Sequence, residues 1–188
     1  MNVRILTAFC AAAAAMICAP AQAAITVFGS GPAEICYHGA ESGSSPFDDI
    51  KYCNEALGGI LSIADRAATY VNRGVLRLAM NNYDAAAADF DAGLAINAGL
   101  GEAYVDRGAA LIAKRRYAEA LADITKGLTL GTKEAQNAYY DRAIANEALG
   151  NIQAAYDDYR HALTLEPGFA AASLELKRFK VVTKPSGT

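Results

Sequence analysis

Three stretches of the chain, "YVNRG" at 70–74, "YVDRG" at 104–108 and "YYDRA" at 139–143, are near copies of one another. Each has a Tyr, a second apolar or aromatic residue, Asn or Asp, then Arg and a small residue. The first two copies are 34 residues apart, and the second and third are 35 apart. Self-similarity at a fixed period of this length indicates a chain built from repeated supersecondary units.

Each repeated unit divides into two segments with small or apolar residues at helical spacing, such as "AATYVNRGVLRLAM" and "YDAAAADFDAGLAI". The segments are separated by "NN", "KRR" and "LGN", and Gly and Asn are typical of helix ends. The extra residue between the second and third units falls in "LGTKEAQ". Because an insertion inside a helix would shift its apolar face, this stretch is predicted to be a loop. The unit is therefore predicted to be two antiparallel helices joined by a tight turn.

The repeated unit resembles the tetratricopeptide repeat, and the resemblance covers roughly residues 67–169. One departure is Ala143, which stands where the other units have Gly. Gly93 and Gly127 replace an Ala, and we expect each to weaken its helix by up to about 1 kcal/mol. The residues that carry the match are Tyr70, Gly74, Tyr83, Ala86 and Phe90 in unit one, Tyr104, Gly108, Tyr117, Ala120 and Ile124 in unit two, and Tyr139, Ala155, Tyr159, Ala162 and Pro167 in unit three.

The resemblance implies an all-α fold, an α-solenoid of stacked helix hairpins. Residues 64–168 would hold three units, at about 67–100, 101–135 and 136–168. Residues 169–188 are predicted to form a capping helix and a flexible tail. Residues 24–63 are predicted to form a helical hairpin and a linker, with Ser62 or Asp65 as the cap of the next helix.

The first 23 residues have the pattern of a secretory signal peptide, with a basic start, a short apolar run and "AQA" at 21–23. The mature chain is then expected to begin at Ala24, exported to a bacterial periplasm or secreted. A transmembrane anchor is the alternative, but the apolar run is short for a membrane span. A lipoprotein signal is disfavoured because neither Cys10 nor Cys18 follows a small residue.

Cys36 and Cys53 are the cysteines that remain after the predicted cleavage. An even number in an exported chain favours a disulfide over a zinc site, for which no suitably spaced His pair is present. Their midpoint lies in the predicted turn "SGSSP", so the two sulfurs would face each other across the hairpin. Closing a loop of this size is expected to stabilise the fold by about 3 kcal/mol.

An Asp stands 16 residues after the Arg of every copy, even across the insertion. Two interpretations are open: a row of basic groups for an anionic ligand, or one salt bridge within each repeat. The second is favoured, since a guanidinium beside helix contacts needs a carboxylate partner. The predicted pairs are Arg73 with Asp89, Arg107 with Asp123, and Arg142 with Asp158.

No sequence pattern indicates catalysis, and the chain is predicted not to be an enzyme and to need no cofactor or metal. His38 and His161 are its only histidines, and "GSGPAE" at 29–34 lacks the Lys-Ser/Thr ending of a phosphate-binding loop. The formal net charge is −3, which disfavours nucleic acid as a partner.

The resemblance implies an interaction module whose first helices line a concave groove for a peptide or helix of an envelope partner. Two alternatives stay open: a self-assembling structural protein, with a possible homo-oligomer, and an accessory subunit of an envelope enzyme. The lining of the groove is predicted to be mainly apolar. The alternative is that this apolar surface packs on the N-terminal hairpin or on a second copy of the chain. The positions carried over are Ala68, Val71, Val75 and Leu78 in unit one, Glu102, Val105, Ala109 and Ile112 in unit two, and Asn137, Tyr140, Ile144 and Glu147 in unit three.

Overall fold

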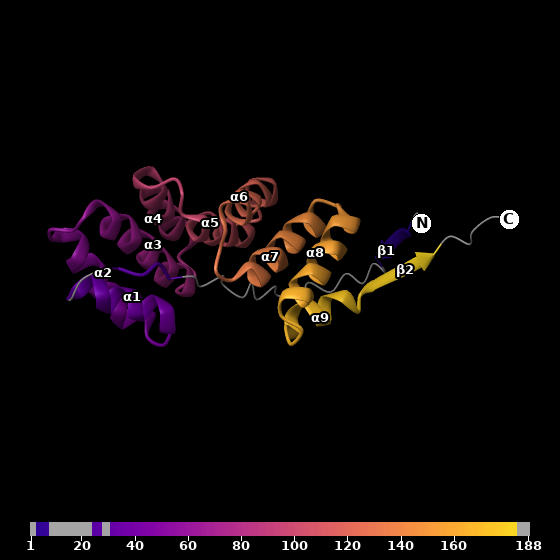
Figure 1. The fold of residues 1–188 in the computed structure, drawn as a ribbon, viewed down its shortest axis with the longest axis horizontal. Coiled ribbons are helices and arrows are strands. Elements are labelled where there is room, and N and C mark those ends of the chain that lie inside the picture. The colour runs from indigo at the N-terminus through magenta and orange to yellow at the C-terminus, as the bar shows by residue number, and fades with distance from the viewer. Residues whose placement is uncertain (1–2, 8–23, 28–30, 184–188) are drawn as a thin grey trace.

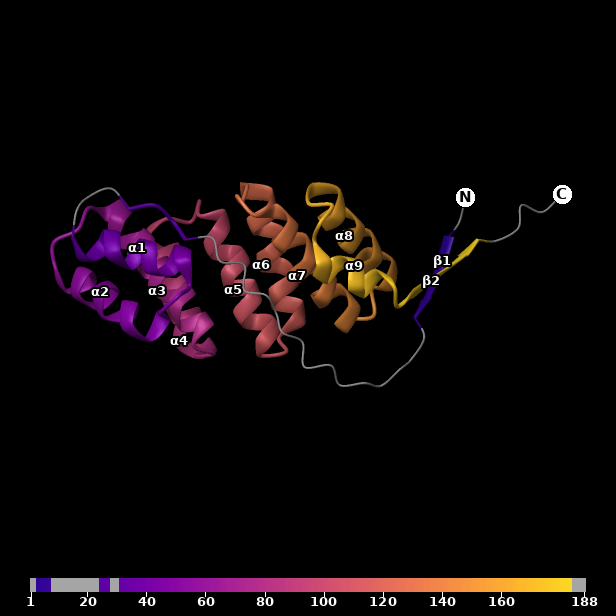
Figure 2. The same cartoon turned by 90° about the horizontal axis from the view of Figure 1, so that it is seen from below.

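The computed structural model describes residues 3–7, 24–27 and 31–183 of the chain. Helix hairpins follow one another along the long axis of the molecule (Figures 1 and 2). Among the described residues, none of the helices combines the length and apolar character that a membrane span needs. The elements are α1 (Pro32–Ser42), α2 (Pro46–Gly58), α3 (Ile63–Ala79), α4 (Tyr83–Ile96), α5 (Gly101–Ala113), α6 (Tyr117–Leu130), α7 (Ala135–Ala148), α8 (Ile152–Leu165) and α9 (Ala170–Leu176), with strands β1 (Val3–Thr7) and β2 (Phe179–Thr183).

Close helix packing inside the first two repeats depends on the glycines of the sequence pattern. A Cβ atom at Gly74 would lie 2.5 Å from the ring of Phe90, and one at Gly108 would lie 2.4 Å from Ile124. The two large side chains are fully buried, so the helices meet where one of them has no side chain. The predicted helix-turn-helix unit is confirmed in all three copies.

Gly93 and Gly127 have a packing role that their low helix propensity does not reveal. A Cβ atom at Gly93 would lie 2.8 Å from Val71, and one at Gly127 would lie 2.6 Å from Val105. The second helix of units one and two thus accommodates a β-branched side chain of the first helix. Close contact with a buried valine compensates for the weaker helix.

The turn between the two helices has the same conformation in each repeat. Asn81, Arg115 and Gly150 stand at equivalent places and have φ values of 59°, 58° and 80°. Asn and Gly accept this left-handed conformation readily, whereas Arg is an uncommon occupant. The breaks "NN", "KRR" and "LGN" are therefore three different sequences that form the same type of turn.

The N-terminal hairpin is closed by a disulfide between Cys36 on α1 and Cys53 on α2, as the spacing predicts. Both cysteines are fully buried, and their Cα atoms lie 4.9 Å apart. Both α1 and α2 contact α3, so this hairpin occupies the place of a preceding repeat. Ser62 caps α3 by accepting a 3.0 Å hydrogen bond from the backbone N–H of Asp65.

The C-terminal part contains the predicted capping helix as α9, followed by a strand that the prediction did not include. Helix α9 packs on α8 but ends at Leu176, and the chain then forms β2. Strand β2 pairs antiparallel with β1, with Val3 opposite Thr183 and Thr7 opposite Phe179. The run "FKVVT" is rich in β-branched residues, which favour a strand over a helix.

Strand β1 lies within the predicted signal peptide, while residues 1–2 and 8–23 of that segment lie outside the described residues. Residues 184–188 of the predicted tail lie outside them too. Apart from this strand pair, the secondary structure of the described chain is helical, and the fold is the expected α-solenoid.

Each predicted Arg–Asp pair forms a two-pronged bridge between the helices of its repeat. Arg107 donates from Nε and Nη2 to the two carboxylate oxygens of Asp123, at 2.7 and 2.8 Å. The same guanidinium lies over the ring of Tyr104, 5.3 Å from its centroid. Equivalent bridges join Arg73 to Asp89 and Arg142 to Asp158.

The bridges also reach beyond their own repeat. Arg107 Nη1 donates to Asp91 on α4 at 2.6 Å, and Arg73 Nη1 donates to Asn54 on α2 at 2.8 Å. The hydrogen bond to Asp123 raises the pKa of Arg107, which remains fully charged. This arginine therefore joins two helices of one repeat and fixes that repeat to the preceding hairpin.

Replacing Asp158 by Asn should lower the free energy of unfolding by about 1–3 kcal/mol, because Arg142 then loses its buried anionic partner. Asp157→Asn is the matched control, because Asp157 is exposed and its carboxylate accepts a hydrogen bond from Gln153, not from an arginine. Thermal unfolding followed by circular dichroism measures both variants. Equal midpoints for the two variants would contradict a structural role for the bridge.

Candidate interaction surface

The first helices of the repeats form the inner side of the stack. Helix α5 contacts both α3 and α7, so the three first helices lie side by side, while α4 and α6 each pack against the first helix of the following repeat. Figure 2 shows α3, α5 and α7 in this succession. We call the side of these helices that carries Asn72, Asp106 and Asp141 the inner face.

An extended segment of the chain itself, residues 24–27, lies against the inner face at the first repeat. The Asn72 side chain accepts a 2.8 Å hydrogen bond from the backbone N–H of Ile25 and donates a 2.9 Å bond to its carbonyl. Asn72 is fully buried, and Val27 packs in one cluster with Ala68 of α3. A side-chain amide thus holds the backbone of an extended polypeptide, independently of the side chain that the polypeptide carries.

Several side chains predicted to line a groove are used for internal packing instead. Val71 and Val105 lie against the glycines of α4 and α6. Tyr140 lies 5.6 Å from the ring of Tyr159 on α8, measured between centroids. Glu147 accepts hydrogen bonds from Tyr159 and from Arg178. These four side chains therefore contact the second helix of their hairpin or the segment after it, and a groove role for them stays a prediction.

Other predicted groove positions are also largely covered. Ala68, Val75, Leu78, Ala109, Ile112 and Ile144 are buried. Asn137 donates a hydrogen bond to Glu134, and Glu102 on α5 is half-buried. A binding role for these residues stays a prediction, and the part nearest α1 is covered by the chain's own residues 24–27.

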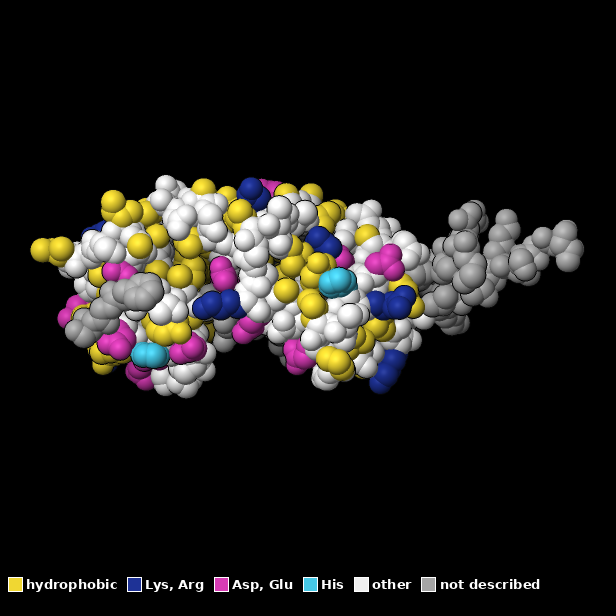
Figure 3. Space-filling view, viewed as in Figure 1, with side chains coloured by type: hydrophobic (Ala, Val, Ile, Leu, Met, Phe, Trp, Pro, Cys, Tyr) yellow, Lys and Arg dark blue, Asp and Glu magenta, His cyan; other side chains and the backbone are white. Residues whose placement is uncertain are grey.

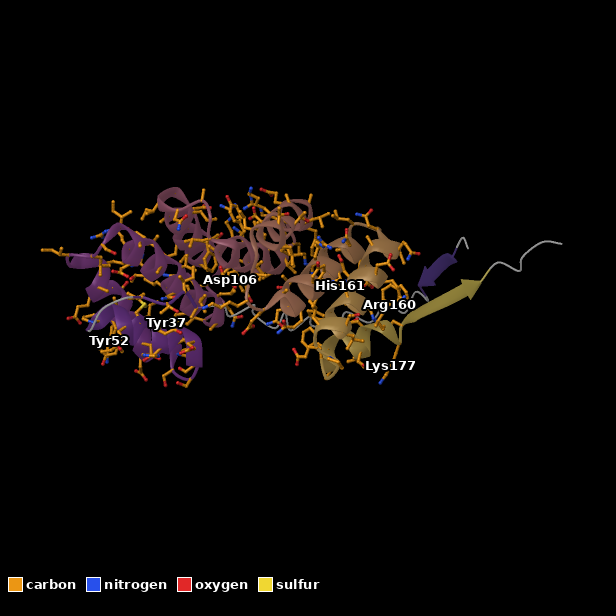
Figure 4. All side chains as sticks on the ribbon, viewed as in Figure 1. Tyr37, Tyr52, Asp106, Arg160, His161 and Lys177 are labelled. Carbon is orange, nitrogen blue, oxygen red and sulfur yellow. A yellow bond between two sulfur atoms is a disulfide. The ribbon has the colours of Figure 1, made fainter. Side chains whose placement is uncertain are left out.

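Two buried acids on the inner face were not predicted as site residues. Asp106 on α5 and Asp141 on α7 stand at the repeat positions equivalent to Asn72, and both are fully buried. Within the described part of the chain, neither carboxylate oxygen of Asp106 has a hydrogen-bond partner. Figure 4 places Asp106 near the middle of the stack. The Asn or Asp before the Arg in the recurring motif is the sequence signal for this position. The Arg–Asp bridge accounts for the Arg of the motif but not for this residue.

The electrostatic surroundings of Asp106 are acidic. Burial raises its pKa well above the usual value, and repulsion from Asp141, Glu102 and Glu134 adds to the increase. Figure 3 shows acidic and basic side chains interspersed over the visible face of the molecule. The inner face therefore concentrates negative charge at one place without a basic partner for Asp106.

A sequence model of the tetratricopeptide repeat matches residues 67–99 and 136–169, the first and third of the three hairpins. The chain contains tetratricopeptide repeats. The middle hairpin has the same close glycine contact and the same Arg–Asp bridge, which identifies it as the second repeat. No curated protein matches the chain in the sequence comparison.

Solved tetratricopeptide repeat structures share this arrangement of helices. The Arabidopsis OM64 domain is 26% identical, with a TM-score of 0.59 over 62% of this chain and 96% of that domain. The second domain of human RPAP3, solved in complex with the HSP70 peptide SGPTIEEVD, is also 26% identical, with a TM-score of 0.57 over 62% of this chain and 96% of its own. MamA, at 18% identity, shares the fold with a TM-score of 0.62 over 76% of this chain and 80% of its own.

Asp106→Asn should stabilise the protein at pH 7 and have little effect near pH 4. Because the pKa is raised in the folded state, the unfolded chain loses its proton first, and stability falls as pH rises above the ordinary value of 3.8. Asparagine removes this pH dependence and occupies the equivalent position in the first repeat. Thermal midpoints of both proteins at the two pH values test this, and an equal difference at pH 4 and pH 7 would contradict it.

Proposed function

We propose that this protein is an exported, non-enzymatic interaction module that holds an extended segment of another protein along its inner face. The single observation that carries this proposal is the two-bond pairing of Asn72 with the backbone of Ile25. It supports the proposal because the same geometry would bind any extended polypeptide at this face. The peptide complex of the RPAP3 domain is consistent with such a role in a related fold.

Export is part of the proposal and is supported by the pattern of residues 1–23 and by the disulfide. A bond between Cys36 and Cys53 suits an oxidising compartment such as the bacterial periplasm. The partner is then expected to be another envelope protein.

Photo-crosslinking through a benzoylphenylalanine at position 102 should capture extended peptides from a random decapeptide library. Glu102 is half-buried on α5, so a probe there adjoins the inner face without replacing a core residue. Ala122, exposed on α6, is the matched control position on the second helix of the same repeat. Equal yields at 102 and 122, or no adduct at either, would count against the proposal.

The oligomeric state is measured on the same preparation by light scattering. A monomer that crosslinks peptides at position 102 supports the interaction module. A stable oligomer whose crosslinks at 102 join two copies of the chain would instead favour self-assembly.

Expression of the full chain in a bacterial host should release a periplasmic protein that begins at Ala24. Intact mass under non-reducing conditions should be two hydrogens below that of the reduced form, and peptide mapping should join Cys36 to Cys53. Reduction should lower the free energy of unfolding by about 3 kcal/mol. A chain that keeps its first 23 residues in the cytoplasm would contradict export, whatever its cysteines do.

A further inference from the structure

The inner face carries one feature that the stability of the fold does not explain. Asp106 is buried without a hydrogen-bond partner, and its position in the first repeat is filled by an Asn that has two. A buried polar group without partners costs about 1–3 kcal/mol, and a second acid nearby increases the cost. A group that lowers stability and forms no stabilising contact is expected at a functional site.

The equivalence of the three positions indicates where the Asp106 side chain points. Asn72 lies 34 residues before Asp106, and Asp141 lies 35 residues after it, the same spacing as the repeats themselves. Asn72 contacts an extended segment that belongs to no helix of the repeats. Neighbouring units of a solenoid are related by a small rotation. The side chain equivalent to Asn72 in the next repeat therefore faces the line along which residues 24–27 would continue if they were longer.

We propose that Asp106 and Asp141 form a subsite for a cationic side chain, Lys or Arg, of the extended segment that the inner face binds. This inference rests on the proposed function and specifies the chemistry of the partner. In this proposal, an amide such as Asn72 binds the backbone of the segment, and the two acids bind one of its side chains.

Charge complementarity is the reason for choosing a cation. Asp141, Glu102 and Glu134 each repel the charged form of Asp106 in the free protein, and among the described residues no basic group offsets this repulsion. An ammonium or guanidinium group placed between two carboxylates would relieve the repulsion and supply N–H donors to Asp106. An acidic or apolar side chain at this place would leave the unmet acceptors buried, so the subsite also discriminates against those ligands.

The subsite differs from the internal arginine bridges in one physical respect. Arg73, Arg107 and Arg142 already have carboxylate partners 16 residues later in the chain. Among the described residues, Asp106 forms no hydrogen bond or salt bridge with any of these arginines, although Arg107 is its neighbour in sequence. The cation must therefore come from outside the repeat.

A double-mutant cycle tests the proposal. The probes are N-acetylated decapeptides recovered by crosslinking at position 102, each compared with analogues in which one Lys becomes norleucine or one Arg becomes citrulline. We expect one such exchange in each peptide to weaken binding by about ten-fold or more, as measured by fluorescence anisotropy. In the Asp106→Asn, Asp141→Asn double variant, the same exchange should change the dissociation constant less than two-fold.

Asp157→Asn serves as the control because it removes one exposed acid from α8. It should leave the ten-fold effect unchanged. Circular dichroism shows whether the double variant is folded, and Asp141→Asn alone provides a second variant that leaves Asp106 in place and should reduce the effect only in part.

The outcomes separate the inference from the proposed function. Peptides that bind at position 102 without preference for Lys or Arg, or with a preference that survives in the double variant, would overturn the inference and leave the interaction module intact. Loss of binding on N-acetylation would assign the acids to a terminal amine instead of a side chain. Displacement of the peptides by millimolar calcium chloride would assign them to a metal ion. If no peptide binds, the proposed function fails and the inference fails with it.

Discussion

The solenoid depends on a bridge between a guanidinium and a carboxylate that is repeated in every unit. In each repeat an Arg of the first helix binds both oxygens of an Asp on the second helix and lies over the Tyr three residues before it. Two of the three arginines also bond to the preceding hairpin. Because the bridge is largely removed from water and bonded at several atoms, it fixes the relative height of the two helices, and hence the register in which repeats stack.

Around this bridge, small residues set the distance between helices. Gly74 and Gly108 admit the large side chains of Phe90 and Ile124, while Gly93 and Gly127 admit valines from the opposite helix. Because side chains of each helix pack into glycine positions of the other, little of the apolar surface of the first helix stays exposed. For this reason the inner face presents few apolar side chains, and its distinguishing groups are the polar residues at the positions of Asn72, Asp106 and Asp141.

The inner face has two parts with different chemistry. At the first repeat, an amide holds the chain's own residues 24–27, which pack beside the disulfide-closed hairpin. At the second and third repeats, acids replace the amide, and the charge around Asp106 is negative. Because the row of equivalent positions has an amide at one end and acids at the other, its two ends differ chemically. A bound segment would therefore favour one orientation and one register.

The repeat period, the Arg–Asp spacing and the symmetric placement of the cysteines determined the fold from the sequence alone, because each constrains residues within one hairpin or in neighbouring ones. The tertiary structure decided which face is free. Val105 and Tyr140 have helical spacing compatible with a groove, yet they contact the adjacent helix or its neighbour once the helices approach closely. The lack of a partner for Asp106 and the pairing of β1 with β2 involve segments far apart in the chain, and a one-dimensional pattern contains no measure of such distances.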